Sequence, residues 1–237
     1  MLKKLKCIMK CMTNKSKFSK MKFEFNASKL DNETKVLNVL QYTRTDKKAY
    51  NAEGYEAGYH TVTLRNKIYE GQRDVSVRFE NVKYDFTGKN VLDIGSNQGG
   101  MLMYISDKIN KGCGIDYNYK LVNAANKLKD YNNYSNLSFF VFDLETEDLN
   151  MISNFYSDSL DIVFLLSVCM WIENWKDVII FAKNSAKDLL FESNGSDQQQ
   201  NEQIEFLHKH YNKVNIIDQH SRDDHQKNRK LILCKNE

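Results

Sequence analysis

Short apolar runs alternate with amphipathic segments from Asn90 to the end of the chain. This alternation predicts parallel strands joined by helices, because a helix must carry the chain back along the sheet before the next parallel strand begins. We expect strands at 90–95, 112–116, 137–143, 160–168 and 188–193, with helices at 99–110, 118–131, 147–156, 174–186 and 197–211.

The last part of the chain departs from that alternation. Two apolar runs, 213–221 and 229–235, are separated only by a short polar stretch. A connection that short cannot cross over a sheet, so the two strands must pair antiparallel. The prediction is a doubly wound α/β fold in three layers, with a seven-stranded sheet of five parallel βα units closed by an antiparallel C-terminal hairpin.

The region before Asn90 is expected to hold smaller elements, namely a helix at 29–43, a hairpin at 60–70 that turns at Arg65-Asn66, and a helix at 74–84. We therefore predict three parts: a flexible basic tail at 1–24, a lid and acceptor-binding extension at 25–84, and a cofactor-binding domain at 85–237.

Charge and cysteine content restrict the partners. Eight lysines precede Glu24, the first acid, and the net charge is only +3, so the rest of the chain is acidic and is not expected to coat nucleic acid. The five cysteines lack zinc-type spacing, which indicates reduced thiols and a cytoplasmic protein. No apolar run reaches the ~18 residues of a membrane span, although a membrane-surface helix remains an alternative for the tail.

The first strand runs into the glycine turn GSNQGG at 95–100. A dinucleotide-binding turn needs a glycine where this chain has Asn97, and Asp93 would repel a pyrophosphate. A cationic nucleoside suits that carboxylate better, and S-adenosylmethionine has both an ammonium and a sulfonium group. We expect Gly95, Ser96 and Gly99 to lie against it.

Acids also end the second and third strands. Asp116 stands where a ribose-binding acid belongs, with Tyr117 placed to lie against the adenine. Asp143 is expected to accept a hydrogen bond from the adenine amino group, with Leu144 in apolar contact. An aspartate at a strand end is often only the N-cap of the next helix, so each acid alone has a structural alternative.

Residues 85–193 resemble the cofactor half of class I S-adenosylmethionine-dependent methyltransferases. The resemblance is carried by VLDIGSNQGG, GCGIDY, FVFDLE and DIVFLLSVCMW, and the final hairpin agrees with that family's reversed seventh strand. It implies a Rossmann-like transferase that releases S-adenosylhomocysteine, with Leu166 and Ser167 as further cofactor contacts. The stretch GYHTV…GQRD…VLDIGSNQGG also resembles bacterial enzymes that tailor sugars or phosphoramidate groups of surface polysaccharides.

The acceptor site is expected on the extension and at the ends of strands four and five. His60 and Glu192 are candidate general bases, and Arg73 is a candidate to bind the cofactor carboxylate or an anionic acceptor. The candidate substrate-binding residues are Tyr59, Trp171 and Asn194, with Trp175 helping Trp171 to cover the pocket. The alternatives are an exposed loop histidine, a surface ion pair for Arg73, and a buried structural role for Glu192 and Asn194.

The first functional hypothesis is O-methylation of a small molecule, without a metal. One alternative is an RNA (tRNA) methyltransferase anchored by the lysine-rich tail, and another is a catalytically silent member that binds the cofactor or a protein. The sequence leaves the acceptor, the methylated atom and the choice between monomer and homodimer open.

Overall fold

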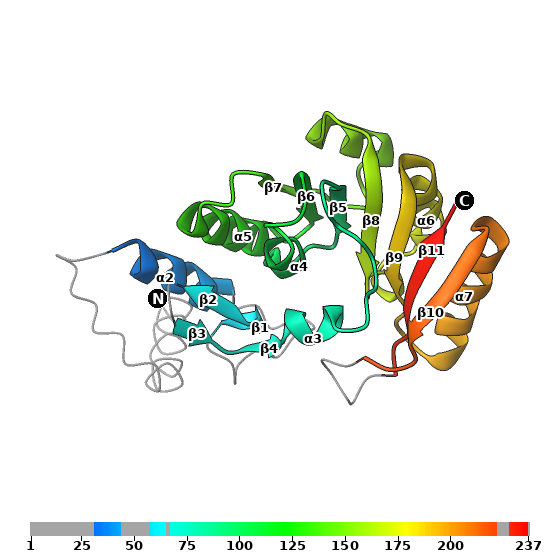
Figure 1. The fold of residues 1–237 in the computed structure, drawn as a ribbon, viewed down its shortest axis with the longest axis horizontal. Helices are drawn as coiled ribbons and strands as arrows, with labels where there is room; N and C mark the ends of the chain where they lie inside the picture. Colours follow the sequence, from blue (N-terminus) through cyan, green and yellow to red (C-terminus); the bar gives the residue numbers. More distant parts are fainter. Residues whose placement is uncertain (1–30, 44–56, 65–66, 222–227, 237) are drawn as a thin grey trace, which may run out of the picture.

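A seven-stranded sheet forms the centre of the computed structural model, which describes residues 31–43, 57–64, 67–221 and 228–236 (Figure 1). Its strand order is β10-β11-β9-β8-β5-β6-β7. The strands are β5 (Asn90–Ile94), β6 (Lys111–Asp116), β7 (Leu137–Val141), β8 (Leu160–Leu166), β9 (Ala186–Glu192), β10 (Lys213–Asp218) and β11 (Leu231–Lys235).

Only β11 runs against the other strands of this sheet. It pairs antiparallel with β9 on one side and with β10 on the other. All the remaining pairs, β5 with β6 and β8, β6 with β7, and β8 with β9, are parallel. The predicted seven-stranded doubly wound sheet with an antiparallel C-terminal hairpin is confirmed, and the later strand of the hairpin lies inside it.

Two apolar layers cover the sheet, because successive side chains of a strand point to opposite faces. Leu92 and Ile94 of β5 belong to the layer that includes α6 (Trp175–Ser185) and α7 (Asp197–His210). Val91 belongs to the other layer, with α4 (Gly100–Tyr104) and α5 (Tyr119–Asn132). The central strands β5, β8 and β9 are therefore buried on both faces.

Two expected helices differ from the observed ones. The helix predicted at 99–110 ends at Tyr104, because the Asn136 amide donates to the carbonyls of Ser106 and Ile109 and the chain turns there. The α-helix predicted at 147–156 is the 3-10 helix η3 (Leu149–Phe155), which is rich in asparagine and serine, residues that favour turns over α-helix interiors.

The N-terminal region forms a small unit beside α5 (Figure 1). Helix α2 (Asn32–Thr43) packs on α5, and β2 (Val62–Leu64) pairs antiparallel with β3 (Lys67–Tyr69), so the predicted hairpin is present but shorter. A parallel pair was not predicted: β1 (Gly58–His60) lies beside β4 (Gly71–Arg73). Helix α3 (Val75–Phe79) is shorter than expected and leads towards β5.

Several sequence predictions lie outside the described residues. They are the lysine-rich tail 1–24, the turn at Arg65-Asn66, and the polar stretch 222–227 between the last two strands. Within the described ranges, no helix has the length and apolar character needed to cross a membrane. The same ranges hold no group of three metal-ligating side chains.

The centre of β8 offers a direct test of this packing. Leu165 is fully buried in the α6 and α7 layer, so Leu165→Ala should lower the free energy of unfolding by about 2–5 kcal/mol. That loss corresponds to a drop of at least about 4 °C in the melting temperature for a chain of this size. Thermal unfolding by circular dichroism measures it. Met151→Ala is the control, because Met151 is 49% exposed and its loss should change little; equal effects of both changes would contradict the burial.

Candidate active site

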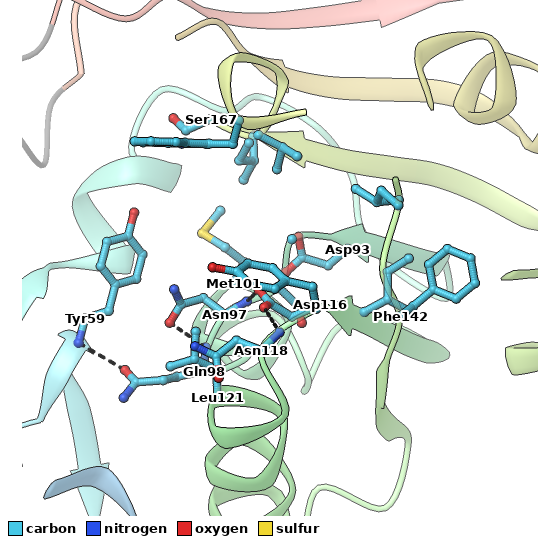
Figure 2. A pocket seen from close by; sticks show the side chains of 18 of the residues that line it. Tyr59, Asp93, Asn97, Gln98, Met101, Asp116, Asn118, Leu121, Phe142 and Ser167 are labelled. Atoms are coloured by element: carbon cyan, nitrogen blue, oxygen red, sulfur yellow. Dashed lines mark hydrogen bonds between the residues drawn. The ribbon is translucent and has the colours of Figure 1, made fainter. Parts of the chain in front are cut away.

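A pocket of about 500 Å³ opens at the carboxyl ends of β5, β6 and β8, where open α/β sheets bind ligands. Its wall combines the glycine turn after β5 with the first residues after β6, β7 and β8, and with β1 from the N-terminal unit. Figure 2 shows Tyr59 on one side of the pocket, Phe142 on the opposite side and Met101 between them. Residues distant in the sequence thus share one cavity.

Asp116 fixes the shape of the glycine turn. Its Oδ2 accepts the backbone N–H of Asn97 at 2.9 Å, and its Oδ1 accepts the N–H of Asn118 at 2.8 Å (Figure 2). Burial raises the pKa of the Asp116 carboxyl, while the two N–H groups act in the opposite direction. The carboxylate still has free lone pairs, since each oxygen can accept more than one hydrogen bond.

Asp93 places a buried carboxyl group with an unpaired oxygen in the pocket wall. Its side chain is 2% exposed, and Oδ2 has no hydrogen-bond partner. The pKa of the carboxyl is raised to about 7, mainly by burial, while the positive charge of Arg78 lowers it and the negative charge of Asp116 raises it. An unpaired carboxylate in such a place costs free energy unless a ligand cation compensates it. The ammonium group of S-adenosylmethionine fits that need.

The glycine turn needs its glycines for two separate reasons. Gly95 and Gly99 have φ of +78° and +77°, in the left-handed region that favours glycine. A Cβ on Gly95 would lie 2.5 Å from the Val168 side chain, and one on Gly99 would lie 2.5 Å from the Phe139 ring. Gly95 and the buried Ser96 line the pocket, whereas Gly99 supports the turn from outside the wall.

The end of β7 supplies the far wall. Phe142, Asp143 and Leu144 line it, and Phe142 and Leu144 are buried. Asp143 accepts the N–H of Glu145 at 3.0 Å. Tyr117 also lines the pocket and is 69% exposed, at its rim. These residues form a flat apolar slot beside a carboxylate, which suits an adenine ring and its amino group.

His60 lies in the opposite wall, next to Tyr59. It is 2% exposed, and its Nδ1 has no hydrogen-bond partner. The pKa of the imidazole is lowered to about 3, mainly by burial and also by Arg78 and Arg73, because a protonated ring would lie near their positive charges. His60 is therefore neutral at pH 7 and accepts a proton only weakly, in contrast to the general base expected from the sequence.

The arginine that reaches the pocket wall is Arg78, not Arg73. Arg73 is buried under Tyr59, with its guanidinium carbon 5.9 Å from the ring centroid. The sequence placed Arg73 in the cofactor site because of its position before the glycine turn. The short helix α3 carries Arg78 one turn further on, and this brings its side chain to the pocket.

Glu192 and Asn194 lie behind the pocket wall, so the predicted acceptor contacts are not seen there. Glu192 pairs with Arg78 at 2.6 Å and accepts hydrogen bonds from Ser167 and Ser221. The Asn194 amide donates to the Ser167 carbonyl and accepts the N–H of Met170 at 2.9 Å.

Together Glu192 and Asn194 hold the turn after β8, where Ser167 has φ of +60°. That turn contributes Leu166, Ser167 and Trp171 to the wall, and Trp171 is 49% exposed at the rim. Trp175 instead packs against Phe206. The buried structural alternative weighed from the sequence therefore describes Glu192 and Asn194.

The pocket brings together most of the predicted site residues, namely Tyr59, His60, Asp93, Gly95, Ser96, Asp116, Tyr117, Asp143, Leu144, Leu166, Ser167 and Trp171. Sequence reasoning missed Thr43, Arg78, Gln98, Met101, Asn118 and Leu121. The signal for Gln98 was its place inside the glycine turn, between Asn97 and Gly99. No signal in the sequence pointed to Thr43, because only the packing of α2 brings it to the pocket.

Residues 92–188 match a family model described as a methyltransferase domain. A co-crystal structure of WbdD with the kinase inhibitor LY294002 superposes with a TM-score of 0.55 at 16% identity, over 70% of this chain and 42% of that chain. The N-terminal domain of EvdMO1 with S-adenosylhomocysteine bound gives 0.52 at 8% identity, over 68% and 79%.

At these identities the likeness to solved structures concerns the fold, and the chain spans less than half the length of WbdD. None of the curated proteins matches the sequence significantly. The strand order and the pocket at the strand ends agree with the family match, so residues 92–188 form a methyltransferase domain of the S-adenosylmethionine-dependent kind.

Proposed function

We propose that this methyltransferase methylates an anionic oxygen of a small, sugar-type acceptor in the assembly of a surface polysaccharide. The observation that carries the proposal is the mixed charge of one pocket: the carboxylates of Asp93 and Asp116 line it together with the Arg78 guanidinium. A sugar phosphate or a phosphoramidate has the charge that Arg78 attracts.

The cofactor is assigned to the carboxylates of the pocket. Asp93 would accept from its ammonium group, Asp116 would accept from its ribose hydroxyls, and Asp143 would accept from its adenine amino group. When bound, the cofactor supplies a methyl group on a sulfonium for in-line transfer. The protein's part is to hold donor and acceptor in line and to exclude water.

The state of the candidate bases supports an acceptor oxygen that is already anionic. His60 is neutral with a pKa of about 3, and Glu192 is held by Arg78 behind the wall. A hydroxyl acceptor needs a base to remove its proton, whereas a phosphate or carboxylate oxygen does not. Neutral His60 retains one ring N–H that can donate to such an oxygen, and Arg78 supplies the positive charge.

The aromatic rim and one structural neighbour, EvdMO1, support a sugar-type acceptor, and the description of WbdD agrees with a phosphorylated one. Trp171 is exposed at the mouth of the pocket, where it offers apolar surface to a sugar ring. WbdD is described as a bifunctional kinase-methyltransferase, and the N-terminal domain of EvdMO1 was crystallised in the presence of S-adenosylhomocysteine and D-fucose.

We assign the acceptor contacts to the extension 25–84 and the cofactor contacts to 85–237. Cys113, Cys169 and Cys234 are buried free thiols, which supports the proposed cytoplasmic location.

The acceptor class is tested with S-adenosylmethionine labelled in its methyl group. Cell extract is separated into neutral small molecules, anionic small molecules and RNA, and each fraction is incubated with the protein. We expect label in the anionic small-molecule fraction, and its loss when that fraction is first treated with phosphatase. Label confined to RNA, with activity that falls when residues 1–24 are deleted, would overturn the proposal in favour of an RNA methyltransferase.

Asp116 should be required for cofactor binding. Asp116→Asn keeps the shape of the side chain but removes an acceptor, so the affinity for S-adenosylhomocysteine should fall by about 10–100-fold, equivalent to about 1.5–3 kcal/mol. Isothermal titration calorimetry measures the change. Asp130→Asn is the control, since Asp130 lies on the exposed side of α5 and its carboxylate is 65% exposed. An unchanged affinity in Asp116→Asn would remove Asp116 from the site.

Cofactor binding should weaken in acid because Asp93 must be ionised to accept an ammonium group. With a pKa of about 7 in the ligand-free protein, the affinity for S-adenosylhomocysteine should fall by about tenfold per pH unit below pH 7 and level off above it. Calorimetry at pH 5.5–7.5 in two buffers of different ionisation enthalpy should also detect proton release.

Asp93→Asn separates binding from stability. It should abolish this pH dependence and weaken binding. Because burial raises the pKa of Asp93, the folded state loses stability as pH rises from about 4 to 7, and the variant avoids that loss. Its ligand-free form should therefore be more stable than the parent at pH 8, by up to about 4 kcal/mol. A variant that is less stable at pH 8 would contradict the burial cost.

A further inference from the structure

We propose that Gln98 is a positioning residue that couples cofactor binding to the order of the acceptor wall. The inference rests on the proposed role of Tyr59 and His60 as acceptor contacts. Gln98 belongs to the glycine turn, but its side chain points away from the acids and towards β1 (Figure 2).

The Gln98 side chain makes four hydrogen bonds, all of them to the N-terminal unit. Its Oε1 accepts the backbone N–H groups of Tyr59 at 3.2 Å and His60 at 3.0 Å. Its Nε2 donates to the Ala57 carbonyl at 3.1 Å and to the Thr43 hydroxyl at 3.3 Å. One buried side chain of the turn therefore holds both β1 and the end of α2.

These bonds add to the pairing of β1 with β4, in which Gly58 lies beside Gly71 and His60 beside Arg73. The N–H groups of Ala57 and Thr61 donate to the carbonyls of Glu70 and Arg73, beside β4. The N–H groups of Tyr59 and His60, which lie between Ala57 and Thr61 in the chain, donate to the Gln98 side chain. Without this side chain, both N–H groups lose one hydrogen bond to the glycine turn, which weakens the attachment of β1 to it.

The turn itself is set by groups that the cofactor is proposed to contact. Asn97, directly before Gln98, donates its N–H to Asp116, and Gly99, directly after it, has φ of +77°. The His60 ring also lies against Gly100, where an added Cβ would be 2.6 Å from Nδ1. A ligand that holds Asp116 and the turn thus restrains Gln98, and through it the wall.

Coupling between two sites is reciprocal, so a ligand that orders the turn must also order what the turn holds. S-adenosylhomocysteine should therefore slow hydrogen exchange at the amides of Tyr59 and His60, although they lie on a different segment of the chain. The same linkage predicts that an ordered acceptor wall tightens cofactor binding. Gln98 would make the binding of the two substrates cooperative.

The test is hydrogen–deuterium exchange with mass spectrometry on peptides that cover 57–61, with and without S-adenosylhomocysteine. In the parent protein we expect the ligand to slow exchange there by about tenfold or more. In Gln98→Ala the ligand should still bind, as calorimetry will show, but the slowing at 57–61 should be lost. Gln98→Glu keeps the acceptor oxygens for Tyr59 and His60, so it should retain part of the effect.

Gln203→Ala is the matched control. Gln203 is also buried and bonds the backbone of one residue, Asn194, at its N–H and its carbonyl, but it lies on the other side of the pocket. It should lower stability comparably and leave the ligand effect at 57–61 intact. If Gln98→Ala does not fold, Gln98→Glu decides the matter through its partial effect.

Three outcomes separate the possible failures. The coupling would be overturned if the ligand slowed exchange at 57–61 as much in Gln98→Ala as in the parent, or more in Gln98→Glu than in the parent. It would also be overturned if the parent protein bound the ligand without any slowing at 57–61. A parent protein that binds no S-adenosylhomocysteine would instead overturn the assignment of the cofactor pocket. Once an acceptor is known, Gln98→Ala should raise its KM more than it lowers kcat.

Discussion

The site depends on one carboxylate that holds two backbone segments at once. Asp116 accepts the N–H of Asn97 in the glycine turn and the N–H of Asn118 before α5. Because Asn118 in turn caps α5 by accepting the N–H of Lys120, the end of β6, the turn and the first turn of the helix form one connected unit. The position of the pocket on the sheet follows from that unit.

Burying a second carboxylate, that of Asp93, in the same pocket costs free energy in the ligand-free protein. Asp93 is buried with an unpaired oxygen near a second carboxylate, and the local strain is only partly offset by Arg78. Binding sites often hold such groups because the ligand, rather than the protein, supplies the missing partner. Arg78 is itself held by a buried ion pair with Glu192, which lies behind the pocket wall.

Much of the sheet was predictable from the sequence, for a local reason. Strands such as β8 are continuous apolar runs, since both of their faces are buried, and a fold that repeats β and α units leaves few topologies. Asp93, Asp116 and Asp143 were found in the same way, because each lies within two residues of the carboxyl end of its strand. Each of these patterns can be read from a segment of about ten consecutive residues.

What the sequence did not reveal depends on contacts between distant segments. The environment of Glu192 is built by Arg78, Ser167, Ser221 and Arg229, which no local pattern connects. His60 was correctly placed near the pocket, yet its pKa depends on burial and on Arg78, so its chemistry was misjudged. The parallel pairing of β1 with β4 was missed because both strands are only three residues long.

The insertion of β11 between β9 and β10 has a consequence for biosynthesis. As the chain emerges from the ribosome, β9 is complete before β10, yet β10 pairs with β11 rather than with β9. Until β11 has been made, β9 presents an open edge and β10 has no place in the sheet, a state in which unpaired strands are prone to associate with other chains. Nascent chains of this protein should therefore depend on chaperones until the final strand is translated.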